Sequence, residues 1–167
     1  MWKTVYLSLG SNLGDRAANL RTAIDRLAAV GKVAAISSFY ETAPVEFTQQ
    51  PWFVNCVVKL DTEKMPKQLL AALLDIELDM GRRRERKKGP RVIDLDILLF
   101  GSSVIQTQCL TVPHPAMHER RFVLEPLAEI APEVRHPVLG QTIRELRDAL
   151  SGQAVRKRAG ENNLSDK

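Results

Sequence analysis

The chain contains the segment Arg91-Val92-Ile93-Asp94-Leu95-Asp96-Ile97-Leu98-Leu99-Phe100, whose pattern fixes the type of fold. Apolar residues at every second position predict a β-strand, because successive side chains of a strand point to opposite faces of a sheet. One face would carry the apolar side chains of Ile93, Leu95, Ile97 and Leu99. Asp94 and Asp96 would share the other face, so both carboxylates point the same way.

The aspartate pair is a candidate metal site. Two residues along a strand span about 6.6 Å, and two ionised carboxylates that close repel each other unless a cation lies between them. Oxygen ligands of this kind favour magnesium. The alternative is a solvated sheet face or pairing with nearby arginines, as antiparallel sheets often show. Aspartate is depleted in strands, so two within three residues favour a functional interpretation.

The segment before this strand is strongly basic. It runs Gly81-Arg82-Arg83-Arg84-Glu85-Arg86-Lys87-Lys88-Gly89-Pro90-Arg91, and seven of its eleven residues are Arg or Lys. Such a run is often only a solvated loop. Next to two candidate metal ligands it predicts a polyphosphate site, because arginine offers a planar fork that matches phosphate oxygens. The sequence has neither a Walker-type glycine loop nor the protein-kinase motifs.

The rest of the chain supplies partners for this strand. We expect strands at 3–9, 32–40, 53–61 and 91–100, and helices at 15–31, 66–80 and 141–150. Asp15 can cap the first helix, and Pro66 suits the first turn of the second. Apolar stripes lie at Leu20, Ile24 and Leu27, and at Leu69, Leu70, Leu73 and Leu74. The order predicts an α+β, ferredoxin-like split βαβ fold, with helices packed on an antiparallel sheet.

Composition indicates a single soluble domain. The chain has 167 residues, 44% hydrophobic and 26% charged, with a formal net charge of +4, which is normal for a globular protein. The N-terminus lacks a signal-peptide pattern, and no apolar run approaches the roughly 20 residues of a membrane span. Two cysteines, Cys56 and Cys109, suit a reducing cytoplasm. We expect one domain at 1–155 and a flexible polar tail at 156–167.

Several motifs in combination resemble one enzyme family. They include Leu9-Gly10-Ser11-Asn12-Leu13-Gly14-Asp15 and Gly89-Pro90-Arg91-Val92-Ile93-Asp94-Leu95-Asp96, with others at 37–44, 50–55, 77–82 and 110–126. By these motifs the chain is similar to the 6-hydroxymethyl-7,8-dihydropterin pyrophosphokinases of folate biosynthesis. The resemblance implies that the catalytic domain, residues 1–155, transfers pyrophosphate from ATP to the pterin hydroxyl, giving the pterin diphosphate and AMP.

The resemblance also implies roles for individual residues. It implies a catalytic group of Arg82, Arg91, Asp94 and Asp96, in which the two aspartates bind two magnesium ions. It implies an ATP site lined by Glu77, Arg84, Lys88, Ile97, Thr111 and His114. It implies a pterin pocket lined by Thr42, Pro44, Val45, Phe53, Asn55 and Phe122.

The sequence bears on two of these assignments independently. Strand alternation puts Phe53 and Asn55 on one face, and Val54, Cys56 and Val58 on the other. An aromatic ring and an amide on one surface suit a flat heteroaromatic ligand, which needs stacking and hydrogen bonds at its edge. His114, fixed between two prolines, is either a donor toward phosphate or a plain loop histidine.

Three positions depart from the pattern that we associate with this family. Lys88 lies where a tryptophan can occur, Cys109 where a basic residue can occur, and Phe53 replaces a tyrosine. The basic loop is also one residue shorter. These changes concern how the loop covers ATP, whereas both aspartates and both key arginines are present.

Two other functions fit parts of the sequence. A ferredoxin-like sheet with a basic loop also describes an RNA-binding module. However, aromatic residues make up only 5% of the chain, and aspartates on the sheet would repel phosphate. A non-catalytic pterin or nucleotide carrier would be favoured if the metal ligands were missing. We therefore expect an enzyme that acts as a monomer on small molecules, with neither nucleic acid nor membrane as a partner.

Overall fold

The computed structural model describes residues 1–43, 52–81 and 91–158. The first half of the chain forms β1 (Lys3–Ser11), α1 (Arg16–Leu27), β2 (Lys32–Ile36), β3 (Tyr40–Thr42), β4 (Phe53–Thr62) and α2 (Pro66–Asp79). The second half forms β5 (Asp94–Phe100), β6 (Ile105–Gln106), β7 (Thr111–Val112), a 3₁₀ turn (Met117–Glu119), α3 (Arg121–Ile130), α4 (Ile143–Asp148) and β8 (Val155–Lys157).

A six-stranded antiparallel sheet forms the centre of the molecule. Its strands lie in the order β5-β1-β4-β3-β8, and β2 also pairs with β4. The split βαβ arrangement has four strand positions. Here they are filled by β5, by β1, by β4, and by β2 together with β3. The predicted ferredoxin-like fold class is therefore confirmed. Strands β6 and β7 form a separate two-stranded sheet.

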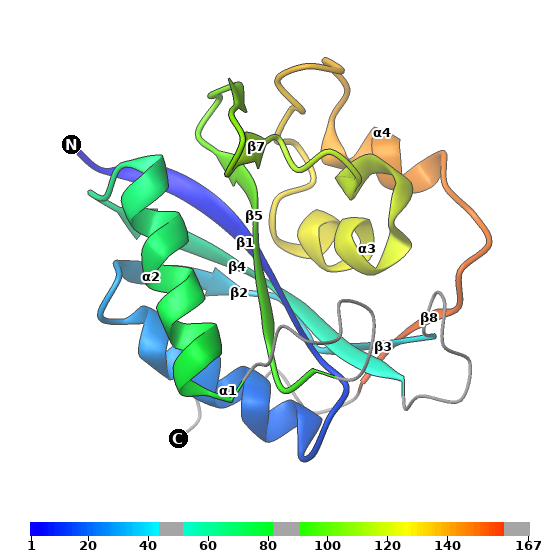
Figure 1. Cartoon of the computed structure of the whole chain (residues 1–167). Helices are drawn as coiled ribbons and strands as arrows, with labels where there is room; N and C mark the ends of the chain where they lie inside the picture. Colours follow the sequence, from blue (N-terminus) through cyan, green and yellow to red (C-terminus); the bar gives the residue numbers. More distant parts are fainter. Residues whose placement is uncertain (44–51, 82–90, 159–167) are drawn as a thin grey trace.

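Helices cover both faces of the central sheet (Figure 1). On the α1/α2 face the core includes Leu9, Leu20 and Leu73, and on the α3/α4 face it includes Val57 and Leu124. Each of these side chains is at most 1% exposed. Burying one such side chain stabilises the fold by about 1.5–3 kcal/mol. The sheet thus separates two cores.

Both helices predicted in the first half are confirmed. Asp15 caps α1, because its Oδ1 accepts a hydrogen bond from Ala18 N at 3.1 Å. Pro66 occupies the first turn of α2, where its missing N–H leaves no helical hydrogen bond unmade. The predicted apolar stripes are buried at Leu20, Ile24, Leu27, Leu69 and Leu73, and half-buried at Leu70 and Leu74.

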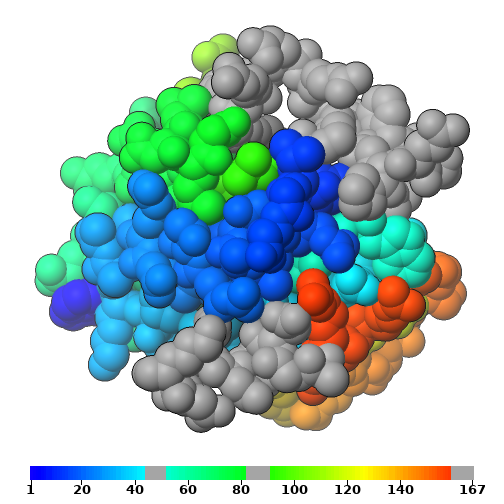
Figure 2. Space-filling view, turned by 90° about the horizontal axis from the view of Figure 1, so that it is seen from below, coloured from blue at the N-terminus to red at the C-terminus, as the bar shows by residue number. Residues whose placement is uncertain are grey.

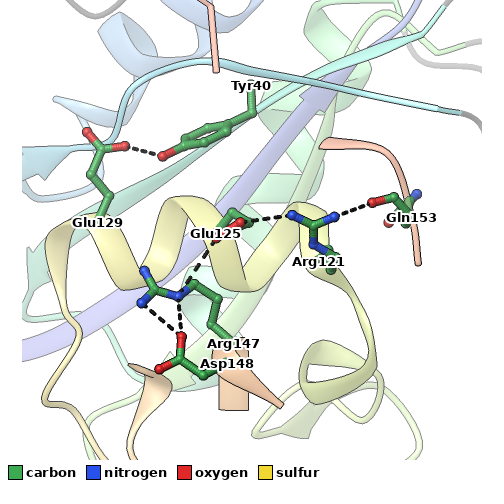
Figure 3. A network of polar contacts seen from close by, with 7 residues as sticks. All are labelled: Tyr40, Arg121, Glu125, Glu129, Arg147, Asp148 and Gln153. Carbon is green, nitrogen blue, oxygen red and sulfur yellow. Dashed lines mark hydrogen bonds and ion pairs between the residues drawn. The ribbon is translucent and has the colours of Figure 1, made fainter. Parts of the chain in front are cut away.

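The strand expected at 32–40 is interrupted by two buried serines. Ser37 Oγ accepts from Val57 N at 2.9 Å. Ser38 donates through its N and its Oγ to the carboxylate of Glu129 on α3. Tyr40 Oη donates to the same carboxylate at 2.7 Å (Figure 3). Because these bonds replace regular pairing, the chain leaves the sheet after β2 and re-enters it as β3.

The alternation predicted for β5 holds only as far as Ile97. Pairing with β1 shifts from Leu7 opposite Ile97 to Tyr6 opposite Leu99, which inserts Leu98. Ile97 belongs to the core of the α1/α2 face, but Leu99 packs on the α3/α4 face. Our placing of Leu99 on the same face as Ile97 was wrong, because an extra residue in a strand reverses the faces beyond it.

Helix α3 was not predicted, because its sequence contains a proline. Pro126 lies inside it and removes one backbone hydrogen bond, which argues against a helix. Val123, Leu124 and Leu127 are nonetheless buried against the sheet. The free energy gained by burying these three side chains exceeds the cost of the missing hydrogen bond.

The last strand of the described residues, β8, also joins the sheet. Strand β8 pairs with β3, with Arg156 opposite Glu41, although we expected a flexible tail from residue 156. Its short polar sequence Val-Arg-Lys has no apolar alternation that would predict a strand. Within the described ranges no helix is long and apolar enough to cross a bilayer.

Candidate active site

Three neighbouring strands bring predicted pterin and metal residues into one row. Gly10 on β1 pairs with Asn55 on β4 at one side and with Asp94 on β5 at the other. The next row, centred on Leu9, belongs to the core of the α1/α2 face, so this row faces the other side of the sheet. Two strand spacings separate Asn55 from Asp94, about 10 Å between Cα atoms.

The second aspartate lies two rows further along β5, beyond the row of Leu9. Asp96 pairs with Ser8, and Leu95 between the two aspartates is buried in the core of the α1/α2 face. Asp94 is half-buried and Asp96 is exposed. Both carboxylates therefore lie on one face of the strand, as the sequence predicts.

Gly10 makes room for the residues of this row. A Cβ at Gly10 would lie 2.7 Å from Asn55 Nδ2 and 3.6 Å from Phe53 Cδ1. The first distance is shorter than real Cβ contacts allow. The backbone of Gly10 has no positive φ, so space rather than conformation requires glycine here.

Asn55 and Phe53 share the surface beside Gly10. Thr42 Oγ1 donates to Asn55 Oδ1 at 2.7 Å, and both residues are buried. This bond fixes the amide with Nδ2 on the Gly10 side. Val54, Cys56 and Val58 lie in the core of the α1/α2 face, so the predicted alternation of β4 is confirmed.

Phe122 lies at the start of α3 and is half-buried against the core of the α3/α4 face. The guanidinium of Arg120 is 5.5 Å from the centroid of the Phe122 ring. This distance is typical of a cation–π contact.

Arg91 is held between the turn after β1 and the start of β5. Its N donates to Asn12 Oδ1 at 2.7 Å, and its carbonyl accepts from Asn12 N at 3.0 Å. These bonds keep Arg91 outside the strand, which begins at Asp94 and not at Arg91 as predicted. Arg91 Nη1 donates to Asp94 Oδ2 at 2.8 Å. Its Nε is buried and makes no hydrogen bond within the described residues, so a donor is available to an anionic ligand.

Glu77 supports the strand of the two aspartates from its outer edge. The side chain lies on α2, is 3% exposed, and accepts from Leu95 N at 2.7 Å through Oε2. Strand β5 is at the edge of the described sheet, so the carboxylate satisfies an amide that no strand reaches there. A direct role of Glu77 toward ATP stays a prediction.

His114 is fixed with one ring nitrogen occupied. Its Nδ1 accepts from Ala116 N at 3.1 Å, so the proton of the neutral ring is on Nε2. Its backbone N donates to Leu98 O at 2.9 Å, which joins this loop to β5. Burial, and next the charge of Arg120, lowers the pKa of His114 to about 4. At neutral pH the ring is therefore an uncharged donor.

Of the other predicted ATP and pterin residues, the structure describes only some. Thr111 is exposed on β7, and the Ile97 side chain is buried in the core of the α1/α2 face. Five predicted site residues lie outside the described residues: Pro44, Val45, Arg82, Arg84 and Lys88.

Sequence analysis missed the contributions of Gly10 and Asn12. The strand that we expected at 3–9 ended before both residues, and a turn after a strand explains a glycine and an asparagine without further function. Strand β1 in fact continues to Ser11. A glycine inside a strand signals a close approach of another group, and that signal is visible only once the strand is extended past Leu9.

Two carboxylates and an arginine on one surface are the kinds of group that phosphoryl-transfer enzymes use for a cation and for phosphate. Comparison with known proteins narrows the class. Residues 6–132 match the family described as 7,8-dihydro-6-hydroxymethylpterin-pyrophosphokinase (HPPK). The chain belongs to the HPPK family.

Two bacterial relatives match over most of their length. A protein of Methylorubrum extorquens named 2-amino-4-hydroxy-6-hydroxymethyldihydropteridine pyrophosphokinase is 48% identical over 142 residues, which cover 84% of this chain and 89% of the relative. A protein of the same name from Bacillus subtilis is 50% identical over 132 residues, which cover 77% of this chain and 78% of the relative. The chain is thus a pyrophosphokinase of folate biosynthesis, and the family match favours this function over the RNA-binding alternative.

Longer proteins match as well. The folic acid synthesis protein fol1 of Schizosaccharomyces pombe is 42% identical over 156 residues, which cover 92% of this chain but 21% of that protein. A crystal structure of Plasmodium falciparum HPPK-DHPS superimposes with a TM-score of 0.72 at 18% identity, covering 89% of this chain and 45% of that one. At this identity the structural likeness shows the fold alone.

Proposed function

We propose that the chain transfers the pyrophosphoryl group of ATP to the hydroxyl of 6-hydroxymethyl-7,8-dihydropterin. The observation that carries this proposal is the row of Asn55, Gly10 and Asp94 across three strands. The row supports the proposal because the Cα atoms of Asn55 and Asp94 are about 10 Å apart, a separation that a hydroxymethyl group and a phosphate chain can bridge.

The pterin would lie against Phe53 and Asn55. Because Thr42 occupies Asn55 Oδ1, Asn55 Nδ2 remains as a donor toward an acceptor on the ring edge. The rings of Phe53 and Phe122 offer stacking surfaces. Pro44 and Val45 complete the proposed pocket.

Asp94 and Asp96 would hold the magnesium, and we propose two ions. Within the described residues no group of three or more His, Cys, Asp or Glu side chains could hold a metal. Two carboxylates nevertheless fit magnesium, which takes its other ligands from water and substrate phosphates. Asp94 also pairs with Arg91, so the arginine pairing that the sequence left open is present, and it is compatible with the proposed metal role. Bound magnesium would neutralise charge on the phosphates.

Arg91 and His114 would act on the phosphates directly. Arg91 Nε, which has no hydrogen-bond partner among the described residues, and the Nε2–H of neutral His114 are both donors; the first is charged and the second is not. Arg82, Arg84 and Lys88 are proposed to add further positive charge.

ATP would also contact the outer edge of β5. The Leu95 N–H faces this edge, where it donates a hydrogen bond to the Glu77 carboxylate. Residues two apart in a strand present backbone groups to the same side, so the backbone of Ile97, and not its buried side chain, is proposed to contact the base. Thr111 would lie beside it. Glu77 then acts on ATP indirectly, by holding the strand.

In the proposed reaction the pterin hydroxyl oxygen attacks the β-phosphorus of ATP. The bond from that phosphorus to the oxygen bridging to the α-phosphorus breaks, AMP leaves, and the hydroxyl loses its proton. Positioning and charge neutralisation supply most of the rate. We further propose a monomer in the cytoplasm, which suits two free cysteines, Cys56 and Cys109.

Chromatography of a single turnover tests the proposal. The enzyme is mixed with ATP, magnesium and the hydroxymethyl-dihydropterin, and the products are separated. We expect AMP and a diphosphorylated pterin in equal amounts. Substrate-dependent ADP with a monophosphorylated pterin would overturn the assignment, and absence of any nucleotide product would favour a non-catalytic carrier.

A further inference from the structure

The segment of residues 153–157 lies directly beside the strands of the proposed pterin pocket. In the β3–β8 pairing Val155 is opposite Thr42, and Ala43 N donates to Ala154 O at 3.3 Å. Figure 2 shows the red atoms of this segment next to the turquoise start of β4. Thr42 is the residue whose hydroxyl fixes the Asn55 amide.

Arg156 contacts both Glu41 and Trp52. Its Nη2 and Nε donate to Glu41 Oε2 at 2.9 and 3.2 Å, and its guanidinium lies 5.0 Å from the centroid of the Trp52 ring. Arg16 donates to the other Glu41 oxygen at 3.3 Å and to the Trp52 carbonyl at 2.6 Å. Trp52 is therefore held by its ring and by its backbone, immediately before Phe53.

This cluster cannot touch the ligand of the proposed pocket. Glu41 pairs with Val54, which lies in the core of the α1/α2 face, and paired residues share a face. Phe53 and Asn55 point to the opposite side. Any effect of Arg156 on the pocket must pass through the backbone of β3 and β4.

A second contact ties the same segment to α3. Gln153 Nε2 donates to Ala43 O at 3.1 Å, and Gln153 O accepts from Arg121 Nη1 at 2.7 Å (Figure 3). Arg121 directly precedes Phe122. Residues 153–156 thus contact the neighbours of three predicted pterin residues: Thr42, Phe53 and Phe122.

We propose that Arg156 is a positioning residue for pterin binding, which fixes Phe53 through Trp52 and Thr42 through Glu41. The proposal rests on the proposed function, since these residues are pterin contacts only if that function holds. The hydrogen bond from Arg156 also lowers the pKa of Glu41, which keeps that carboxylate charged and able to pair with both arginines.

Steady-state kinetics of Arg156→Ala test this role. The contact with Trp52 is partly exposed, so we expect the KM for the pterin to rise about three- to tenfold, with kcat and the KM for ATP within about twofold of the original protein. Lys157→Ala is the matched control, because Lys157 is an exposed neighbour on the same strand. It should leave all three parameters unchanged.

Tryptophan emission provides an independent readout. The chain has two tryptophans, Trp2 and Trp52, so a Trp2→Phe background isolates Trp52. Arg156→Ala should change the Trp52 emission in that background, and Lys157→Ala should not. A change in emission accompanied by an unchanged KM for the pterin overturns the proposal.

Two further outcomes are decisive. A parallel fall of kcat, a rise of both KM values and a lower melting temperature would mean that Arg156 is merely structural, which also overturns the proposal. If the original protein makes no pterin-dependent AMP, the proposed function has failed instead, and the two failures are thereby distinguished.

Discussion

Gly10 lies directly opposite Asn55 in the β1–β4 pairing, and a methyl group on Gly10 would meet Asn55 Nδ2 at 2.7 Å. Asn55 is buried and bonded to Thr42, so its amide cannot move aside without losing that bond. The side chains allowed at position 10 and the position of the Asn55 amide therefore depend on each other.

Gly10→Ala should damage the pocket and, less severely, the fold. We expect a loss of about 1–3 kcal/mol in the free energy of unfolding from overpacking, and a fall in kcat/KM for the pterin of about 10- to 100-fold from misplaced groups. Urea unfolding and steady-state kinetics measure these effects. Adding Gly10→Ala to an Asn55→Ala background should cost less than about 0.5 kcal/mol, since the clashing amide is gone. An equal cost in both backgrounds would contradict the clash.

Substituting Asp94 or Asp96 should lower activity to a similar extent but should affect stability differently. Asp94→Ala and Asp96→Ala should each lower turnover by about a thousandfold or more, if both hold magnesium. Asp94→Ala should also cost about 1 kcal/mol of stability, because the half-buried Arg91 loses its carboxylate partner. Asp96 is exposed, so its loss should be near neutral. Unfolding without magnesium separates the two effects, and near-normal turnover in both variants would refute the metal site.

Glu77 can be tested by comparing two substitutions. Glu77→Ala leaves the buried Leu95 N–H without its acceptor, so we expect a loss of about 1–3 kcal/mol in the free energy of unfolding. Glu77→Gln keeps an acceptor oxygen and should retain most of that stability. If both variants are equally stable and both raise the KM for ATP, Glu77 contacts ATP directly and our indirect role is wrong.

His114 should titrate far below the ordinary value of 6.5, since its pKa is lowered to about 4. The unfolded chain then binds more protons than the folded one between about pH 4 and 6.5, so the stability from this residue is complete above pH 6.5 and is lost as pH falls. The loss should amount to at most about 3 kcal/mol. NMR titration of the three histidine rings should show one midpoint near 4. His114→Asn should flatten the dependence of unfolding free energy on pH in this interval.

The sequence predicted the elements that local patterns govern and failed where distant contacts decide. Alternation and caps sufficed for α1, α2 and the aspartate face of β5. The face of the sheet on which Leu99 lies depends on an inserted residue in β5, which a two-residue period cannot reveal. The pairing of Arg91 with Asn12 joins residues 79 positions apart, and β8 exists because β3 offers it an edge. Such contacts follow from the assembled sheet.

The carboxylate of Glu77 has one more consequence, which concerns association between molecules. An unpaired strand edge is a template on which another chain can add a strand. At the β5 edge Glu77 already occupies the Leu95 N–H, and at the β8 edge the exposed Arg156 and Lys157 place charge. Both ends of the described strand order are thus guarded against edge-to-edge growth into fibres. Glu77→Ala would leave one of them open to aggregation.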